Sequence, residues 1–88
     1  MYRVELSSRA LKSLRRLPPD LGRRILEGLR ILEENPVPKG ALKIKGGKDV
    51  YRLRIGDYRI LYTILEKETC ILVFKIEHRK RAYRQNDQ

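Results

Sequence analysis

The sequence predicts an α+β fold, a small antiparallel β-sheet of about four strands with an N-terminal helical hairpin packed on one face, in the order β-α-α-β-β-β. Three features predict it. Leucine and isoleucine recur at helical spacing between residues 10 and 32, apolar and polar residues alternate from 51 to 65, and a nearly continuous apolar run follows. With 88 residues, we expect positions 1–88 to form a single domain with a modest core.

The N-terminal part predicts one strand and two helices. Tyr2–Leu6 alternates as a strand does, and Ser7–Ser8 supplies an N-cap for the first helix. Pro18 ends this helix, because the residue before a proline is pushed out of the α region. Pro19–Asp20 suits the first turn of a second helix, which Asn35–Pro36 stops. The apolar positions expected to face the sheet are Ala10, Leu11, Leu14, Leu17, Leu21, Ile25, Leu29 and Leu32, with Leu26 and Ile31 beside them.

The stretch Tyr51–Leu65 predicts a β-hairpin around Gly56–Asp57. Glycine at the first central position of a two-residue loop suits a type II′ turn, which sets the register and places Arg54 opposite Arg59. Strand alternation then sorts the side chains onto two faces. One face carries Tyr51, Leu53, Ile55, Tyr58, Ile60, Tyr62 and Ile64, and the other carries Arg52, Arg54 and Arg59 with Leu61 among them.

Two further strands complete the sheet. Leu42–Lys45 alternates and predicts a short edge strand, in which lysines protect the edge from pairing with other chains. The apolar run Cys70–Glu77 predicts a central last strand, in which Cys70 is a small core residue. A loop of Lys67–Thr69 would pair Glu66 with Cys70, Arg59 with Glu77 and Ile60 with Ile76, and would bring Lys75, Glu77 and Arg79 to the arginine side.

Composition narrows the class of function. Lys and Arg total 21 against 11 Asp and Glu, so the net charge of +10 indicates a polyanionic partner or an acidic protein. One His and one Cys argue against a zinc site, and we expect no metal or other cofactor. No apolar window reaches transmembrane length and no signal peptide is recognisable, so we expect a cytoplasmic protein that does not enter a membrane.

The arginine side of the hairpin has two interpretations. Like charges directly opposite each other destabilise a sheet, so the Arg54–Arg59 pair favours an anionic partner such as an RNA phosphate. Alternatively, Arg52, Arg54 and Arg59 solvate the open face of a one-sided sheet.

Two residues near the C-terminus could add acid–base or stacking roles that arginines cannot supply. His78 titrates near neutrality, and Tyr83 can stack on a base or donate a hydrogen bond, although a structural role is open for both. Together with the arginines they form a candidate site for RNA cleavage by internal transfer. The basic residues expected to contact RNA phosphates without chemistry are Lys43, Lys45, Lys80 and Arg81.

Four motifs carry a family resemblance: Leu-Lys-x-Leu followed by Leu-Pro, Asn-Pro, Tyr-Arg-Leu-Arg-Ile-Gly-Asp-Tyr-Arg-Ile-Leu-Tyr, and His-Arg-Lys-x-x-Tyr. In this order they resemble the RelE group of the RelE/ParE toxin superfamily. The resemblance implies the toxin of a type II toxin–antitoxin system, a metal-independent endoribonuclease (mRNA interferase) that cuts mRNA on the ribosome and leaves a 2′,3′-cyclic phosphate. It also implies a cognate antitoxin that wraps the toxin, and binding to operator DNA only through that complex.

The resemblance also implies roles for residues. Arg59 matches the arginine that stabilises the phosphate, Arg79 matches a second catalytic arginine, and Tyr83 matches a tyrosine that stacks on the substrate. Arg52 and Arg54 stand where well-studied members carry lysines. The identity of the general base therefore stays open between Arg54, a poor base, and His78.

Two other functions remain. A ParE-like protein would share the fold and inhibit DNA gyrase, and a basic binding module would occupy RNA or the ribosome without cutting. Because two amphipathic helices rarely hide all of their apolar surface on a small sheet, we also expect exposed apolar helix residues to meet the antitoxin.

Overall fold

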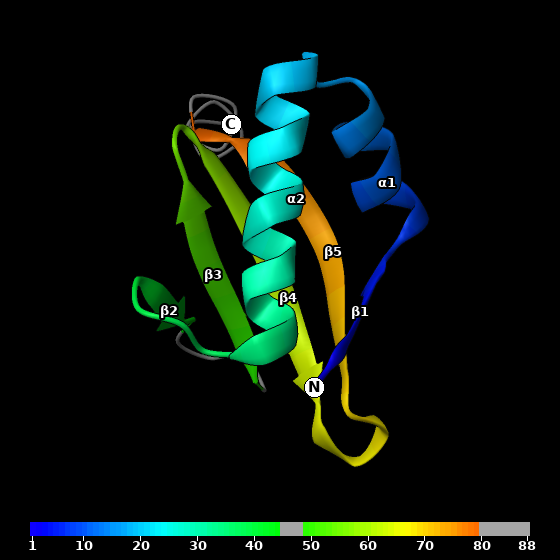
Figure 1. Ribbon diagram of the computed structural model, residues 1–88, viewed down its shortest axis with the longest axis vertical. Helices are drawn as coiled ribbons and strands as arrows, with labels where there is room; N and C mark the ends of the chain where they lie inside the picture. Colours follow the sequence, from blue (N-terminus) through cyan, green and yellow to red (C-terminus); the bar gives the residue numbers. More distant parts are fainter. Residues whose placement is uncertain (45–48, 80–88) are drawn as a thin grey trace, which may run out of the picture.

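The computed structural model describes residues 1–44 and 49–79. Its elements are β1 (Arg3–Leu6), α1 (Ser8–Arg15), α2 (Pro19–Glu34), β2 (Ala41–Lys43), β3 (Val50–Ile55), β4 (Tyr58–Leu65), the 3₁₀ turn η1 (Glu66–Glu68) and β5 (Cys70–His78). The five strands form one sheet in the order β1-β5-β4-β3-β2. In Figure 1, α2 crosses in front of the sheet and α1 lies beside it, next to β5 and β1. The predicted α+β class is confirmed.

The sheet differs from the prediction in one respect, because it is mixed and not wholly antiparallel. β1 runs parallel to β5, with Arg3 opposite Cys70 and Leu6 opposite Val73, whereas every other pair in the described sheet is antiparallel. The predicted edge strand is present as β2, but it begins one residue earlier than predicted, at Ala41, and ends at Lys43. It brings the number of strands in the described part of the chain to five. Alternation in a short strand predicts which side chains are buried but not which neighbour the strand joins or in which direction.

Local sequence signals set the ends of both helices. The Ser7 hydroxyl accepts a hydrogen bond from the backbone N–H of Ala10 at 3.1 Å, as an N-cap does, and donates one to the carbonyl of Phe74 on β5 at 3.3 Å. The helix start is therefore tied to the sheet. α2 begins at Pro19 and ends at Glu34, one residue before the predicted Asn35–Pro36 stop.

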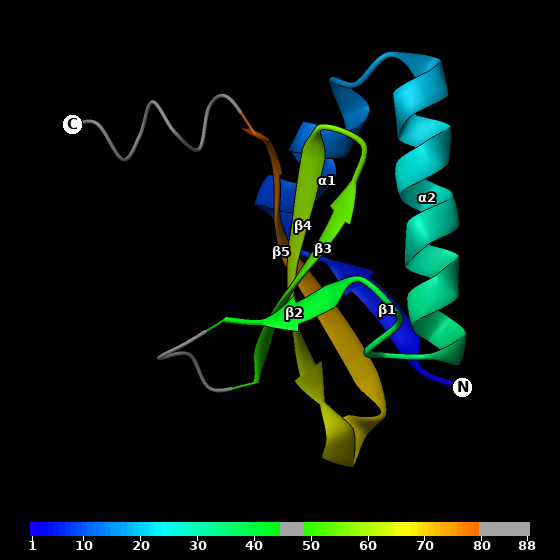
Figure 2. The ribbon, with the colours of Figure 1, turned by 90° about the vertical axis from the view of Figure 1, so that its left-hand side faces the viewer.

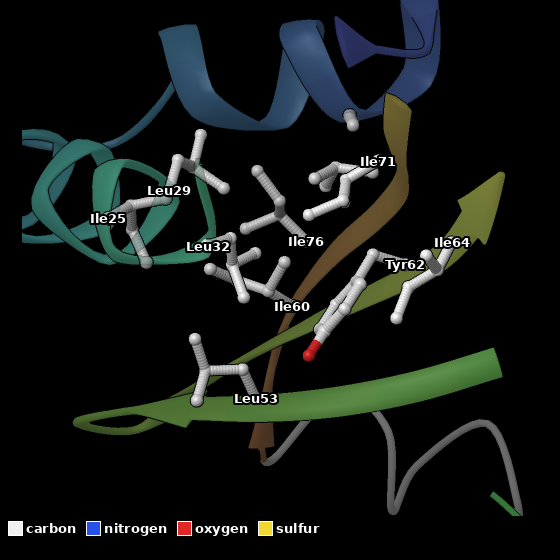
Figure 3. Packing of buried hydrophobic residues seen from close by; sticks show 11 residues of the cluster. Ile25, Leu29, Leu32, Leu53, Ile60, Tyr62, Ile64, Ile71 and Ile76 are labelled. Atoms are coloured by element: carbon white, nitrogen blue, oxygen red, sulfur yellow. The ribbon is translucent and has the colours of Figure 1, made fainter. Parts of the chain in front are cut away.

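The core lies between the helices and one face of the sheet. Ile25, Leu29 and Leu32 of α2 are buried, and Figure 3 shows them pointing toward Ile60 and Ile76 of the sheet. The flanking positions of the same helix behave differently, since Leu26 and Ile31 are 48% and 54% exposed. These three positions of the predicted stripe are therefore confirmed, whereas Leu26 and Ile31 face outward. On α1, Leu11 was also expected to face the sheet but is exposed.

The β3–β4 hairpin has the predicted register. Arg54 lies opposite Arg59 and Tyr51 opposite Tyr62. Gly56 has a φ of 58°, a left-handed conformation that glycine adopts without steric cost, as the first central residue of a type II′ turn requires.

The register between β4 and β5 is only half as predicted. Arg59 pairs with Glu77, and Ile60 with Ile76, as expected. An irregularity between Leu61 and Tyr62 then shifts the pairing by one residue, so that Cys70 lies opposite Leu65 and not Glu66, which begins η1 instead. An extra residue on one strand is a β-bulge, and loop length alone does not reveal it.

Tyr62 fastens the loop after α2 to the sheet. Its ring is fully buried and stacks on Tyr51 with centroids 5.7 Å apart, and its hydroxyl donates to the carbonyl of Pro36 at 2.7 Å. Burial, and to a lesser extent the neighbouring Tyr51, raises the pKa of Tyr62 to about 12. The phenol is therefore a neutral donor over the ordinary pH range.

Candidate active site

The sheet face turned away from the helices carries three of the predicted site residues, Arg52, Arg54 and Arg59. We call it the arginine face and define it by Arg52, Arg54, Arg59, Leu61, Lys75 and Glu77. Residues directly opposite one another point to the same side, with Cβ atoms about 4.5–5.5 Å apart, so the register builds two rows. One row is Arg54–Arg59–Glu77, and the other is Arg52–Leu61–Lys75. Arg54 is exposed, and the rest are partly exposed.

The arginine face also holds a carboxylate. Oε2 of Glu77 lies 3.2 Å from Nζ of Lys75, and the two side chains are only 14% and 28% exposed. The predicted register places both residues on this side, but no sequence motif singles out Glu77 as a site residue. The signal was its predicted position opposite Arg59.

Arg79 follows β5 directly and reaches the same end of the molecule. Its backbone N–H donates to the carbonyl of Asp57, in the β3–β4 turn, at 2.8 Å. The end of β5 and this turn lie together at one end of the molecule in both Figure 1 and Figure 2. This hydrogen bond places Arg79 next to the end of the arginine face that carries Arg54 and Arg59, and Arg79 is exposed there.

His78 is not brought together with the arginines. It lies opposite Tyr58 on β4, and the two rings form a T-shaped contact with centroids 5.0 Å apart and an interplanar angle of 86°. Tyr58 belongs to the helix-covered side, so strand alternation directs His78 away from Arg59 and Glu77. The predicted Arg59–Glu77 pair already implied this placement.

Lys43 also lies off the arginine face. It is opposite Tyr51, which belongs to the core side, and its Nζ lies 3.8 Å from Oδ1 of Asp49. Its neighbour Leu42, opposite Arg52, is the β2 residue that adjoins the arginine face, and it is 55% exposed. Four predicted residues lie outside the described part of the chain: Lys45, Lys80, Arg81 and Tyr83.

The guanidinium of Arg24, which the sequence did not predict as a site residue, approaches the hairpin turn from α2. A Cβ placed on Gly56 would lie 3.4 Å from a guanidinium nitrogen of Arg24. Thirty-two residues separate the two positions in the sequence, and no local pattern connects them. Arg24 adds positive charge at the end of the molecule where Arg79 leaves the sheet.

The described site offers cations and one carboxylate. Arginines bind phosphate oxygens through two parallel N–H donors, and a carboxylate accepts protons. No group of three or more His, Cys, Asp or Glu residues within residues 1–44 and 49–79 is arranged to hold a metal ion. In the same residues, no helix has the length and apolar character needed to cross a membrane.

The chain is similar to known toxins over nearly its whole length. A family model described as the ParE toxin of the type II toxin–antitoxin system parDE matches residues 4–83. RelE1 of Methanocaldococcus jannaschii, a protein named as a toxin, is 37% identical over 86 residues, which cover 94% of this chain and 96% of that protein. Toxin RelG of Mycobacterium tuberculosis is 27% identical over 84 residues, covering 94% and 97%.

Solved structures agree with these relatives. The RelE–RelB complex of Pyrococcus horikoshii contains a chain with a TM-score of 0.80 and 39% identity, and the match covers 91% of this chain and 97% of that one. A chain of the intact Escherichia coli RelBE toxin–antitoxin complex also has a TM-score of 0.80, with 22% identity, 89% of this chain covered and 96% of that one, and so supports the fold. The protein therefore belongs to the RelE/ParE superfamily of type II toxin–antitoxin toxins, as a RelE-like member.

Proposed function

We propose that this toxin is a ribosome-dependent mRNA endonuclease that cleaves by attack of a 2′-OH on the adjacent phosphate, without a metal. The observation that carries the proposal is the Arg54–Arg59–Glu77 row, because it joins two phosphate-binding cations to a proton acceptor. The similarity to RelE proteins supports it.

The chemistry assigns distinct tasks to the cations. The attack places extra negative charge on the phosphoryl oxygens, and preorganised donors aimed at that charge lower the barrier. Arg59 and Arg79 would stabilise this charge, and Arg52 and Arg54 would bind the RNA backbone. Tyr83 would stack on a base of the substrate, as the family resemblance implies.

A cognate antitoxin is the second part of the proposal. The similar RelE chain of P. horikoshii was solved in complex with RelB. In this protein, Leu26 and Ile31 on α2 are about half exposed, and they are apolar surface that a partner could cover. The antitoxin would cover such apolar surface and neutralise the toxin, and the complex would bind its operator DNA.

One observation favours a second function. The matching family model is named after ParE, so inhibition of DNA gyrase is the alternative. In that case the basic surface would meet an acidic enzyme surface, DNA cleavage complexes would accumulate in expressing cells, and translation would continue.

Primer extension tests the endonuclease directly. Purified protein, freed of antitoxin, is added to a reconstituted translation system, and the ends of the message are mapped. We expect ribosome-dependent cuts within codons for the wild type. Loss of one preorganised contact should slow cleavage by roughly two to three orders of magnitude in Arg59→Ala and Arg79→Ala.

Arg30→Ala is the matched control, because Arg30 is exposed on α2 and lies outside the arginine face. It should cut like the wild type. Intact message in the presence of bound toxin would favour the non-cleaving binding module, and full activity of both site variants would refute the assigned site.

A further inference from the structure

The general base is the part of the reaction that the cations do not supply. A guanidinium hardly deprotonates, so Arg52, Arg54 and Arg59 are poor proton acceptors. His78 points to the helix-covered side, against Tyr58. Among the described residues that form the arginine face, the carboxylate of Glu77 is the proton acceptor.

The position of Glu77 fits that task. It lies directly opposite Arg59, so the two Cβ atoms are about 4.5–5.5 Å apart on the same side of the sheet. In RNA the attacked phosphate is bonded to the 3′-oxygen of the same ribose that carries the 2′-OH. A base for that hydroxyl must therefore stand next to the cation that holds the phosphate, as Glu77 stands next to Arg59.

The surroundings of Glu77 allow a carboxylate to approach RNA. A lone carboxylate would repel a phosphate, but Nζ of Lys75 lies 3.2 Å from Glu77 and Arg59 occupies the next strand. Only 14% of the Glu77 side chain is exposed, so few water molecules screen these charges. The two cations therefore offset the repulsion between the carboxylate and an approaching phosphate.

We propose that Glu77 is the general base of the cleavage reaction, a role that rests on the proposed endonuclease function. Glu77 takes the proton of the 2′-OH, and the 2′-oxygen forms a bond to phosphorus. The bond from phosphorus to the 5′-oxygen then breaks, and that oxygen takes a proton from water. The products are a 2′,3′-cyclic phosphate and a 5′-OH, and Glu77 afterwards releases its proton to solvent.

A structural role is the competing explanation, since Glu77 also neutralises part of the positive charge around Arg59. The two roles differ in their pH dependence. A general base must be deprotonated, so cleavage by the wild type should fall toward acid pH as the carboxylate protonates. A residue that only positions Arg59 would, when replaced, lower the rate by the same factor at every pH.

The test is single-turnover cleavage on ribosomes carrying a defined message, with toxin in excess, measured across a pH series. Glu77→Gln keeps the size of the side chain and removes the base, so its rate at neutral pH should drop roughly 10²- to 10⁴-fold and its acid limb should disappear. Glu77→Asp keeps a carboxylate, and should recover part of the rate together with the acid limb. Thermal melts establish that each variant is folded.

Glu5→Gln is the matched control. Glu5 is paired with Arg3 at 2.6 Å on the edge strand β1. It lies opposite Leu72, five residues before Glu77 on β5, so the substitution makes the same change of charge away from the arginine row. It should leave the rate and the pH profile unchanged.

The outcomes separate the two proposals. Wild-type cleavage with an unchanged rate in Glu77→Gln, or with a lowered rate and a retained acid limb, overturns the role of Glu77 alone. No cleavage by the wild type overturns the endonuclease function, and the role of Glu77 with it.

Discussion

The two faces of the sheet are built from alternating residues of the same strands, yet one is packed against the helices and the other carries exposed charges. On the helix-covered face, Ile60 and Tyr62 are fully buried. On the arginine face, their neighbours Arg59 and Leu61 stay partly exposed, and Arg59 lies opposite a second arginine. The covered face supplies stability through packing, whereas the arginine face gives up some stability to hold charges in a row. Substitutions on the two faces should therefore affect different measurements.

The largest expected effect comes from adjacent residues of β4. Ile60→Ala removes a fully buried side chain and leaves a cavity, so the free energy of unfolding should fall by about 2–5 kcal/mol. Arg59→Ala should change the free energy of unfolding little, while it slows cleavage by roughly two to three orders of magnitude. Urea denaturation combined with the primer-extension assay measures both quantities. Comparable loss of stability in the two variants would contradict the division between faces.

The glycines of α2 test how closely the helix packs on the covered face. A Cβ on Gly28 would overlap Cδ1 of Ile55, and such overpacking typically costs about 1–3 kcal/mol, less if the isoleucine rotates away. Gly22, in the same helix, has nothing within 4 Å of its Cβ position. Gly22→Ala should therefore stabilise the protein by roughly 0.5–1 kcal/mol through helix propensity, whereas Gly28→Ala should destabilise it. Thermal melts of the two variants, run side by side, would show opposite shifts.

The third test concerns the hydrogen bond from the buried Tyr62 hydroxyl to the Pro36 carbonyl. Tyr62→Phe removes the donor to the Pro36 carbonyl and should cost about 1 kcal/mol, whereas Tyr51→Phe, in the stacked partner, should cost less. The pKa of Tyr62 is raised from 10.0 to about 12, so the unfolded state loses its proton first as pH rises. Wild-type stability should therefore decline between these values, by up to about 1.4 kcal/mol per pH unit from this group.

The stability difference between wild type and Tyr62→Phe, followed by denaturant titration from neutral to alkaline pH, isolates this contribution from the lysines and other tyrosines. A difference that stays constant through pH 10–12 would mean that the phenol titrates alike in both states.

The smallest effect concerns the pair of like charges. Arg54→Gln relieves the repulsion from Arg59 and should raise the free energy of unfolding by about 0.2–1 kcal/mol at low salt, with a smaller gain at high salt. Arg30→Gln is the control, because Arg30 is spaced three and four residues from Glu33 and Glu34 on α2 and loses attraction instead. Equal changes in the free energy of unfolding of the two variants would indicate that Arg54 and Arg59 do not repel each other measurably.

The start of the first helix, both ends of the second helix, the hairpin register and the composition of the arginine face all follow from local sequence, whereas the first helix ends at Arg15, three residues before the predicted Pro18. These features depend on caps, on a two-residue turn and on a period of two, all of which act over a few residues. Strand alternation alone thus assigns Arg54, Arg59, Lys75 and Glu77 to one side of the sheet, and the structure agrees.

Three features could be learned only from the folded chain: the parallel placement of β1, the bulge that sets Cys70 opposite Leu65, and the approach of Arg24 to Gly56. Each of these depends on contacts between segments far apart in the chain, which local patterns do not encode. The orientation of His78 depends on both local and tertiary information. Strand alternation predicts which face of the sheet it occupies, but only once the pairing of β4 with β5 is known. That pairing, in turn, brings Glu77 next to Arg59, where a proton acceptor and a phosphate-binding cation can act on one substrate.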